Sequence, residues 1–375
     1  MLSDSEQKQL DYKLQIVRAE RYACQSVARK ALPTERVSKC LRFVTNGSNV
    51  QVWKHKKTQK AFYAGLLVCG SVWQCPLCAA KISEKRRQEL KQAFDIHKQN
   101  GGYIAMLTLT FSHQRFDKLA DILDKFGQAT KKFMSGRAFQ NIRDEMHLLG
   151  RIRVLEVTYS DDNGFHPHAH IALFYESEVD IKSLENKMYL LWEKACNKVG
   201  LKTSKEHGLK LDGADEAESY LSKHGSWSLE QEMSKAHIKK AKKGSMTPFD
   251  FLRTYLVEED EKYLKLFREY VQCFKGKRQL QWSQGLKKKF ILEDKTDEEL
   301  AKEKVEEADL LGLLEYEFWR KILYYEHRSL FLDLCEKNGF EKAISELSKS
   351  ISNFECAMKK SQVPPKNLTI KDIKL

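Results

Sequence analysis

A short histidine-rich segment, HPHAHIALF at residues 166–174, carries the strongest chemical signal in the sequence. Side chains alternate between the two faces of a β-strand, so His168 and His170 project from one face if this segment is a strand. Two imidazoles on one face form half of a metal site. His166 can extend the row, although Pro167 fixes the backbone beside it and can bend the end of the strand.

The third metal ligand depends on how this strand pairs with the preceding one. Residues 151–160, RIRVLEVTYS, are typical of a strand, and the linking segment DDNGFHP contains strong turn residues. If the loop has an odd number of residues, we expect Glu156 opposite His170 and Thr158 opposite His168. A two-residue Asn-Gly turn would shift the register by one residue and place Glu156 on the other face. Glu156 is therefore a conditional third ligand.

Four cysteines near the N-terminus have the spacing of a structural metal site. Cys69, Cys75 and Cys78 form a C-x5-C-x2-C pattern, and Cys40 lies upstream. Four thiolates suffice for tetrahedral zinc, with His55 as a substitute fourth ligand. The alternative interpretation is a set of buried thiols that act as small hydrophobic residues. The remaining cysteines of the sequence are isolated and are interpreted as packing residues.

A tyrosine in the segment GADEAESYLSKHGS, residues 213–226, lies between charged neighbours. On a helix, Tyr220 shares a face with Glu216, Lys223 and His224. A phenol has a pKa of about 10 in water, and it becomes a better nucleophile if Lys223 and a nearby metal favour its anion. The alternative interpretation is a surface helix with one half-buried tyrosine.

A basic segment at residues 275–290, KGKRQLQWSQGLKKKF, combines cations with aromatic side chains. Cations bind phosphates, and an aromatic ring can stack on an unpaired base. A solvated basic helix followed by a turn is the simpler alternative. The DNA-contacting residues predicted here are Lys275, Lys277, Arg278, Trp282, Lys287, Lys288 and Lys289.

These residues require a particular set of secondary-structure elements. Apolar periodicity predicts helices, and β-branched and aromatic runs predict strands. We therefore expect an α+β fold, in which an antiparallel sheet has helices packed to one side, with a zinc-knuckle-like N-terminal segment and a C-terminal helical tail from about residue 294. Helices are predicted over residues 5–30, 81–99, 117–134, 180–199 and 214–224, and strands over 103–111, 151–160 and 168–175.

The charge of the chain is unevenly distributed. The formal net charge is +13, and the apolar content of 42% is enough to build cores. We predict four regions: a basic region with the cysteine cluster at 1–100, a nearly neutral catalytic domain at 101–230, a basic DNA-contacting extension at 231–292 and helices at 293–375. Two basic regions on either side of a neutral centre suit a polyanionic ligand such as DNA.

The sequence also indicates a cytoplasmic location. The N-terminal residues contain no apolar stretch and include acidic side chains, which argues against a secretory signal. The longest apolar-leaning stretch, residues 61–73, is shorter than the ~20 residues that a membrane span needs. We expect no membrane partner.

Five segments, taken in order, resemble a known family. LTLTF at 107–111, HPHAHIALF at 166–174 and ExxxYLSK at 216–223 resemble the three motifs of rolling-circle replication initiators (Rep proteins) of small bacterial plasmids. CGSVWQCPLCAAKISEKRR at 69–87 and the basic segment at 275–290 are also similar to segments of this family. The resemblance covers residues 36 to 292 and implies the fold of the HUH endonucleases, which are named after a histidine–hydrophobe–histidine motif.

The resemblance implies a specific chemistry. His168 and His170 would hold a Mg or Mn ion that polarises the scissile phosphate of the origin DNA. Tyr220 would attack this phosphate and keep it as a 5′-phosphotyrosine, with Lys223 steadying the charge. Glu216 matches the position of a residue that activates water for the terminating cleavage in some relatives. His224 departs from the family, which often has a second tyrosine there.

The resemblance also implies partners, and two other functions stay open. The partners are the double-strand origin of a plasmid with its single-stranded cleavage site, a host helicase and a polymerase. One alternative is a non-catalytic zinc-knuckle protein that binds DNA and has structural histidines. The other is a related HUH nickase, either a relaxase or a transposase.

Overall fold

A computed structural model describes residues 4–45, 47–213, 244–302 and 307–361 of the 375-residue chain. The chain divides into two compact units, each built from separate stretches of sequence. Unit 1 comprises residues 1–78, 252–264 and 297–375, and unit 2 comprises residues 79–251 and 265–296. Helices α2, α8 and α9 contribute residues to both units.

Unit 2 is built around a five-stranded sheet with the strand order β6-β3-β5-β4-β7. Every neighbouring pair in this sheet is antiparallel. The strands that were predicted over residues 103–111, 151–160 and 168–175 are confirmed as parts of β3, β4 and β5. The strands are β3 (Tyr103–Leu109), β4 (Leu148–Ser160), β5 (Gly164–Tyr175), β6 (Leu209–Asp212) and β7 (Leu280–Trp282).

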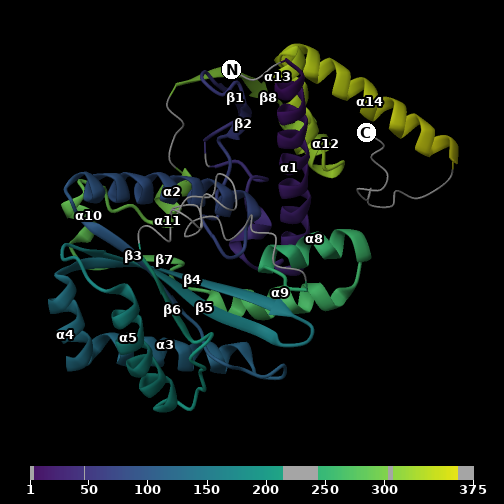
Figure 1. The fold of residues 1–375 in the computed structure, drawn as a ribbon. Coiled ribbons are helices and arrows are strands. Elements are labelled where there is room, and N and C mark those ends of the chain that lie inside the picture. Colours follow the sequence, from purple (N-terminus) through teal and green to yellow (C-terminus); the bar gives the residue numbers. More distant parts are fainter. Residues whose placement is uncertain (1–3, 46, 214–243, 303–306, 362–375) are drawn as a thin grey trace. The chain divides into compact units, whose positions relative to one another are not determined.

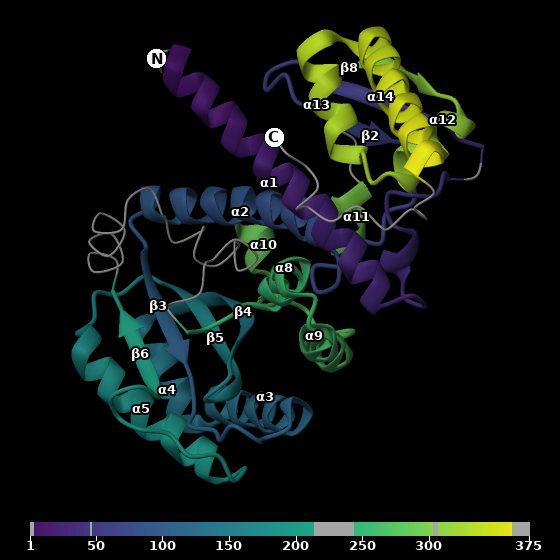
Figure 2. The same cartoon turned by 90° about the vertical axis from the view of Figure 1, so that its right-hand side faces the viewer.

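The prediction that helices pack to one side of the sheet is wrong, because helices cover both faces, as Figures 1 and 2 show: α3, α4 and α5 lie on one face and α2 on the other. On the α2 face, apolar side chains of the strands pack against Leu90, Ala93 and Phe94. Asp180 begins α5 by accepting hydrogen bonds from the backbone amides of Lys182 and Ser183. The helices of this unit are α2 (Pro76–Gln99), α3 (Leu119–Ser135), α4 (Arg137–Met146), α5 (Ile181–Asn197), α8 (Pro248–Glu258), α9 (Glu261–Phe274) and α10 (Leu286–Lys289).

The β4–β5 hairpin has a register that differs from both predicted ones. Ser160 pairs with Gly164 across a three-residue loop, and Glu156 lies opposite His168. The predicted pairing of Glu156 with His170 is therefore wrong by two residues, and the two-residue turn is also wrong. Gly164 has a φ of +74°, and a glycine in this left-handed conformation can close a three-residue loop. The centre of this loop is Asp162, whereas the predicted pairing of Glu156 with His170 is centred on Asn163. A shift of two residues leaves Glu156 on the same face as the histidines.

Unit 1 contains a three-stranded antiparallel sheet with the order β2-β1-β8. Its core consists of buried side chains from this sheet, from α1 and from the C-terminal helices, among them Val52, Trp319, Phe331 and Leu347. The elements are α1 (Asp4–Ala31), a 3-10 helix (Arg36–Lys39), β1 (Val50–His55), β2 (Ala61–Ala64), α11 (Asp297–Lys302), β8 (Ala308–Leu314), α12 (Tyr316–Tyr324), α13 (Arg328–Asn338) and α14 (Phe340–Ser361).

The structure confirms the predicted α+β class, with antiparallel sheets and packed helices. The C-terminal helices are present, but strand β8 lies among them and pairs with β1. The predicted helix over residues 214–224 lies outside the described residues. Among the helices that the structure describes, none has the length and apolar character required to cross a bilayer.

Candidate metal centre

Glu156, His168 and His170 bring one carboxylate and two imidazoles together on the α2 face of the sheet. Nε2 of His168 lies 3.4 Å from Oε2 of Glu156, and Nε2 of His170 lies 3.9 Å from the same oxygen. The three potential ligand atoms all lie within 4.8 Å of one another. The side chain of Glu156 is 6% exposed, and those of the histidines are 14% and 12% exposed. The structure thus gathers the three predicted ligands at one half-buried site.

Hydrogen bonds at the Nδ1 atoms fix the orientation of both rings. Nδ1 of His168 lies 3.2 Å from the backbone oxygen of His166, and Nδ1 of His170 lies 3.1 Å from Oγ1 of Thr108. A carbonyl can only accept, so the proton of a neutral His168 lies on Nδ1 and its Nε2 carries the lone pair. Such partners orient a histidine for metal binding. Thr108 lies in the LTLTF motif, but its contact with His170 was not predicted.

The donor set fits a divalent cation. Two imidazole nitrogens and one carboxylate oxygen form the facial set that leaves further coordination positions open for water or substrate. The ligand atoms need to approach by only a few tenths of an ångström to share an ion, since typical ligand distances are about 2.0–2.2 Å. Imidazole and carboxylate together accept several divalent ions.

A second pair of imidazoles continues the row away from the metal ligands. The ring centroids of His113 and His166 lie 4.8 Å apart, and Phe111 lies 5.9 Å and 6.0 Å from them. Burial, and then the neighbouring His168 and His113, lower the pKa of His166 to about 3. Burial also lowers the pKa of His113. Burial thus favours the neutral form of both rings.

The four predicted cysteines converge in unit 1, where all of them are buried. The Sγ atom of Cys78 lies 3.6 Å from that of Cys40 and 3.5 Å from that of Cys69, and the Sγ atoms of Cys75 and Cys40 lie 3.9 Å apart. A tetrahedral zinc site with Zn–S bonds of about 2.3 Å has sulfur–sulfur edges of about 3.8 Å. The cluster therefore has the dimensions of a tetrahedral thiolate site, and His55 is not one of its members.

Polar groups around the cysteine cluster favour a thiolate at Cys75. The backbone amides of Cys69 and Cys78 donate to Sγ of Cys40 and Cys75 at 3.3 Å and 3.5 Å. Gln25 donates to Sγ of Cys75 at 3.7 Å and accepts a hydrogen bond from the fully buried Arg328. Burial opposes the charged form of Cys75, but hydrogen bonds from the other thiols outweigh it and hold its pKa well below the usual value.

The basic segment at 275–290 divides into exposed and buried residues. Lys275, Lys277, Arg278, Lys288 and Lys289 are exposed. The Nζ of Lys287 is buried, donates to the backbone oxygen of Glu293 at 3.0 Å and lies 3.5 Å from the Glu89 carboxylate. Trp282 packs against the core of the α2 face and has Nζ of Lys287 5.6 Å from its ring centroid. The structure therefore shows that Lys287 and Trp282 have partners within the protein.

Three predicted catalytic residues, Glu216, Tyr220 and Lys223, lie outside the described residues, as does His224. Their roles stay predictions. The last described residue before them, Gly213, directly follows β6, the edge strand that pairs with β3. Strand β3 also pairs with β5 and places Thr108 opposite His170.

A two-histidine, one-carboxylate centre on an antiparallel sheet, together with a separate four-cysteine cluster, defines the class of site. The chain matches the model of the protein family described as "Replication protein" over residues 65–325. This match covers more than half of the chain, so the chain belongs to this family of replication proteins. The family assignment confirms the resemblance to plasmid Rep initiators that the motifs indicated.

Three relatives illustrate the extent of the similarity. A "Protein rep" from Streptomyces lividans is 26% identical in an alignment of 290 residues that covers 60% of this chain and 63% of that protein. A "Protein rep" from Lentilactobacillus hilgardii is 33% identical over 102 residues, 27% of this chain and 31% of that protein. A "Neomycin resistance protein" from Streptomyces cyanogenus is 29% identical in an alignment of 131 residues that covers 28% of this chain and 30% of that protein. The chain thus spans less than two thirds of the length of each relative. No solved structure matches it significantly.

Proposed function

We propose that this protein initiates rolling-circle replication of a plasmid by nicking, and later religating, one DNA strand at the origin. The observation that carries the proposal is the convergence of Glu156, His168 and His170 within 4.8 Å on one face of the sheet. Membership of the replication protein family, and relatives named "Protein rep", support the same function.

Glu156, His168 and His170 would hold a Mg or Mn ion. When bound, this ion supplies Lewis acidity to the scissile phosphate. Thr108 and the backbone oxygen of His166 hold the two imidazoles with Nε2 directed toward Glu156. The carboxylate of Glu156 contributes the only formal negative charge of the three ligands and so sets the charge that the site offers to a cation.

Tyr220 would be the nucleophile, as the motif ExxxYLSK implies. Its phenolate oxygen forms a bond to the scissile phosphorus, and the bond from that phosphorus to the 3′ oxygen of the preceding nucleotide breaks. The departing oxygen takes up a proton and becomes the 3′ hydroxyl that primes synthesis, while the 5′ phosphate stays on Tyr220. Lys223 would stabilise the tyrosinate or the phosphate, and Glu216 would activate water for the terminating cleavage.

The DNA would be bound through exposed cations of unit 2, namely Lys275, Lys277, Arg278, Lys288 and Lys289. Lys287 and Trp282 would hold this surface in place through contacts inside the unit, because both contact other residues there. In unit 1 the cluster of Cys40, Cys69, Cys75 and Cys78 would bind a structural zinc ion. A host helicase and a polymerase are the proposed protein partners at the origin.

The decisive experiment incubates the full chain with supercoiled plasmid that carries its origin, in the presence of Mn. We expect a nicked circle with covalently attached protein, and mass spectrometry should locate the adduct at Tyr220. Tyr220→Phe should abolish the adduct, and His170→Ala should abolish nicking. His207→Ala is the matched control, because its side chain is 84% exposed and it lies outside the metal site.

Two outcomes would decide against the proposal. Origin binding without any nicking, unaffected by His170→Ala, would favour the non-catalytic zinc-knuckle protein, for which the four-cysteine cluster is the supporting observation. Nicking at the origin that persists in Tyr220→Phe would assign the nucleophile to another residue and remove the basis for the covalent intermediate.

A further inference from the structure

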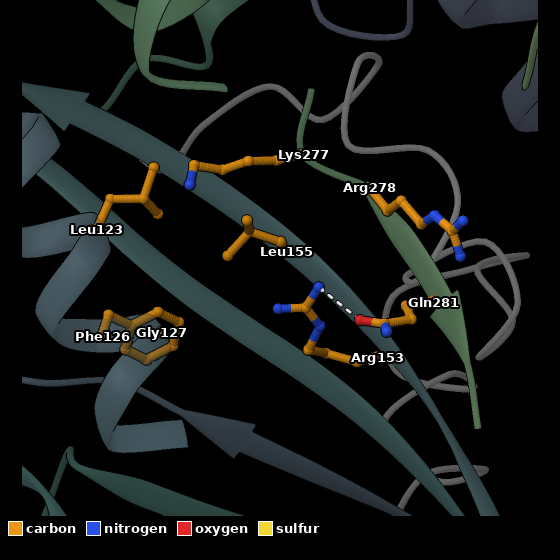
Figure 3. Close-up of a pocket in the computed structure, with 8 residues that line it drawn as sticks. All are labelled: Leu123, Phe126, Gly127, Arg153, Leu155, Lys277, Arg278 and Gln281. Carbon is orange, nitrogen blue, oxygen red and sulfur yellow. Dashed lines mark hydrogen bonds between the residues drawn. The ribbon is translucent and has the colours of Figure 1, made fainter. Parts of the chain in front are cut away.

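A pocket of about 320 Å³ opens in unit 2 where α3 lies beside the β4–β7 edge of the sheet. Its floor is apolar, with Leu123, Phe126 and Leu155, and Gly127 belongs to its wall. Figure 3 shows the side chain of Lys277 extending toward Leu123 across this floor. The remaining lining residues are Arg153, Arg278 and Gln281.

This pocket lies on the face of the sheet opposite to the metal centre. Side chains alternate along β4, so Arg153 and Leu155 point away from the face that carries Glu156. The face that carries Glu156 packs on α2, whereas residues of α3 line the pocket on the opposite face. A ligand in the pocket therefore contacts none of the proposed metal ligands.

Two arginines, Arg151 and Arg153, lie close together at this edge. Burial, followed by the neighbouring Arg151, lowers the pKa of Arg153. Arg151 is affected in the same way by burial and then by Arg143. In the described part of the chain, neither Arg151 nor Arg153 forms an ion pair with a carboxylate, and Nε of Arg153 has no hydrogen-bond partner. A half-buried arginine without a counter-ion is costly, so this edge is suited to bind an anion.

We propose that the pocket holds one nucleotide of an unpaired DNA strand. Arg153 and Lys277 would bind its phosphate, and its base would cover the apolar floor of Leu123 and Leu155. The volume suits one nucleotide, and an inorganic anion would leave the apolar floor uncovered. This inference rests on the proposed function, because it takes the bound strand to be DNA near the origin. It assigns to unit 2 a strand-anchoring site that needs no metal.

Gly127 allows a direct steric test. A Cβ atom added at Gly127 meets no heavy atom within 4 Å, and its φ lies outside the left-handed region, so larger side chains fit the helix backbone. Gly127→Phe should fill the pocket, whereas Gly127→Ala changes the helix in the same place without filling it. Both variants should have a melting temperature equal to or above that of the wild type, because both replace a helical glycine.

The measurement is the affinity of the full-length protein for a fluorescent thymidine oligonucleotide without added Mg or Mn, compared with an abasic oligonucleotide that has the same number of phosphates. We expect the wild type and Gly127→Ala to bind the base-bearing strand about tenfold more tightly than the abasic strand. Gly127→Phe should lose most of this preference. A Gly127→Phe protein that keeps the full preference would overturn the proposal.

A charge variant keeps the proposal testable if Gly127→Phe does not fold. A plot of log affinity against log salt concentration has a negative slope. Lys277→Ala should reduce the magnitude of this slope by about one. The matched control is Lys205→Ala, an exposed lysine four residues before β6 at the other edge of the sheet. Equal salt dependence in both variants would overturn the proposal. Since the proposed nicking needs Mg or Mn and neither is added, these results do not depend on whether the protein cleaves the origin.

Discussion

Thr108 determines how His170 is presented to a metal ion. Its hydroxyl lies 3.1 Å from Nδ1 of His170, on the side of the ring away from Glu156. Thr108→Val keeps the shape of the side chain and removes this hydrogen bond. We expect Mn affinity to fall by about 10–100-fold, the usual effect of losing an outer partner of a ligating histidine. Titration calorimetry or the paramagnetic signal of free Mn measures this change.

The control for Thr108→Val lies two residues away in the same motif. The hydroxyl of Thr110 donates instead to the backbone oxygen of His207. Thr110→Val should leave Mn affinity within about twofold of the wild type, because it removes a hydrogen bond of the same kind elsewhere. Equal losses in both variants would mean that the motif acts through general stability of the β3 strand and not through His170.

The two histidines could be predicted because strand alternation depends on local sequence alone, whereas Glu156 was conditional on the register of the hairpin. His168 and His170 are two residues apart, and any strand places them on one face. Thr108 could not be assigned in this way, since its position opposite His170 arises from the pairing of β3 with β5, which are separated by more than fifty residues. The adjacent pair of His113 and His166 was missed for the same reason.

At the scale of secondary-structure elements, the β4–β5 hairpin depends on Gly164. This residue has a φ of +74°, and an added Cβ atom would lie 2.6 Å from the backbone oxygen of Arg115. Gly164→Ala should therefore lower the free energy of unfolding by about 1–3 kcal/mol. Chemical denaturation followed by circular dichroism measures the loss, and Mn affinity should fall with it because Glu156 and His168 pair within this hairpin.

For a second glycine-to-alanine change in the same unit, we expect the free energy of unfolding to change in the opposite direction. Gly127 lies inside α3 in an ordinary helical conformation with open space around it. Gly127→Ala should raise the free energy of unfolding by up to about 1 kcal/mol, because alanine restricts the unfolded chain and favours the helix. If both variants destabilised the protein equally, the backbone conformation of Gly164 would not be the cause of its effect.

The elements were more predictable than their pairing. Helical and strand periodicity correctly indicated α3, α5, β3, β4 and β5, because these patterns repeat over many residues. The register of the hairpin was wrong by two residues, since it depends on which residue adopts the left-handed conformation. Strand β8 was missed because ADLLGLL follows a highly charged helical pattern, and only its pairing with β1 makes it a strand.

At the scale of the whole molecule, both compact units are discontinuous in sequence. Unit 1 joins the N-terminal residues to residues 252–264 and to the C-terminal part of the chain. The four regions predicted from charge are continuous, because net charge is counted along the sequence and carries no information about long-range contacts. Their assignment to separate domains stays a prediction. The core of unit 1 contains side chains from both ends of the chain, such as Tyr22 and Leu347.

This organisation predicts that removing a zinc ion from the cysteine cluster destabilises the two units unequally. A site of this type contributes on the order of 10 kcal/mol to folding of the region that contains it. In unit 1, Gln25 links Cys75 to Arg328, so loss of the ion should also loosen α13 and the helices packed on it. Hydrogen exchange after chelation should show reduced protection in residues 297–361, whereas β3, β4 and β5 keep theirs.

Two cysteine variants separate the metal from the thiol itself. Cys78→Ala removes a member of the cluster and should reproduce the exchange pattern of the chelated wild type, with less than one zinc per chain. Cys196→Ala removes an equally buried thiol of α5 in unit 2 and should retain the metal and the protection of residues 297–361. Loss of protection in β3, β4 and β5 on chelation, to the same extent as in unit 1, would show that the two units unfold as one and that the cluster stabilises the whole molecule.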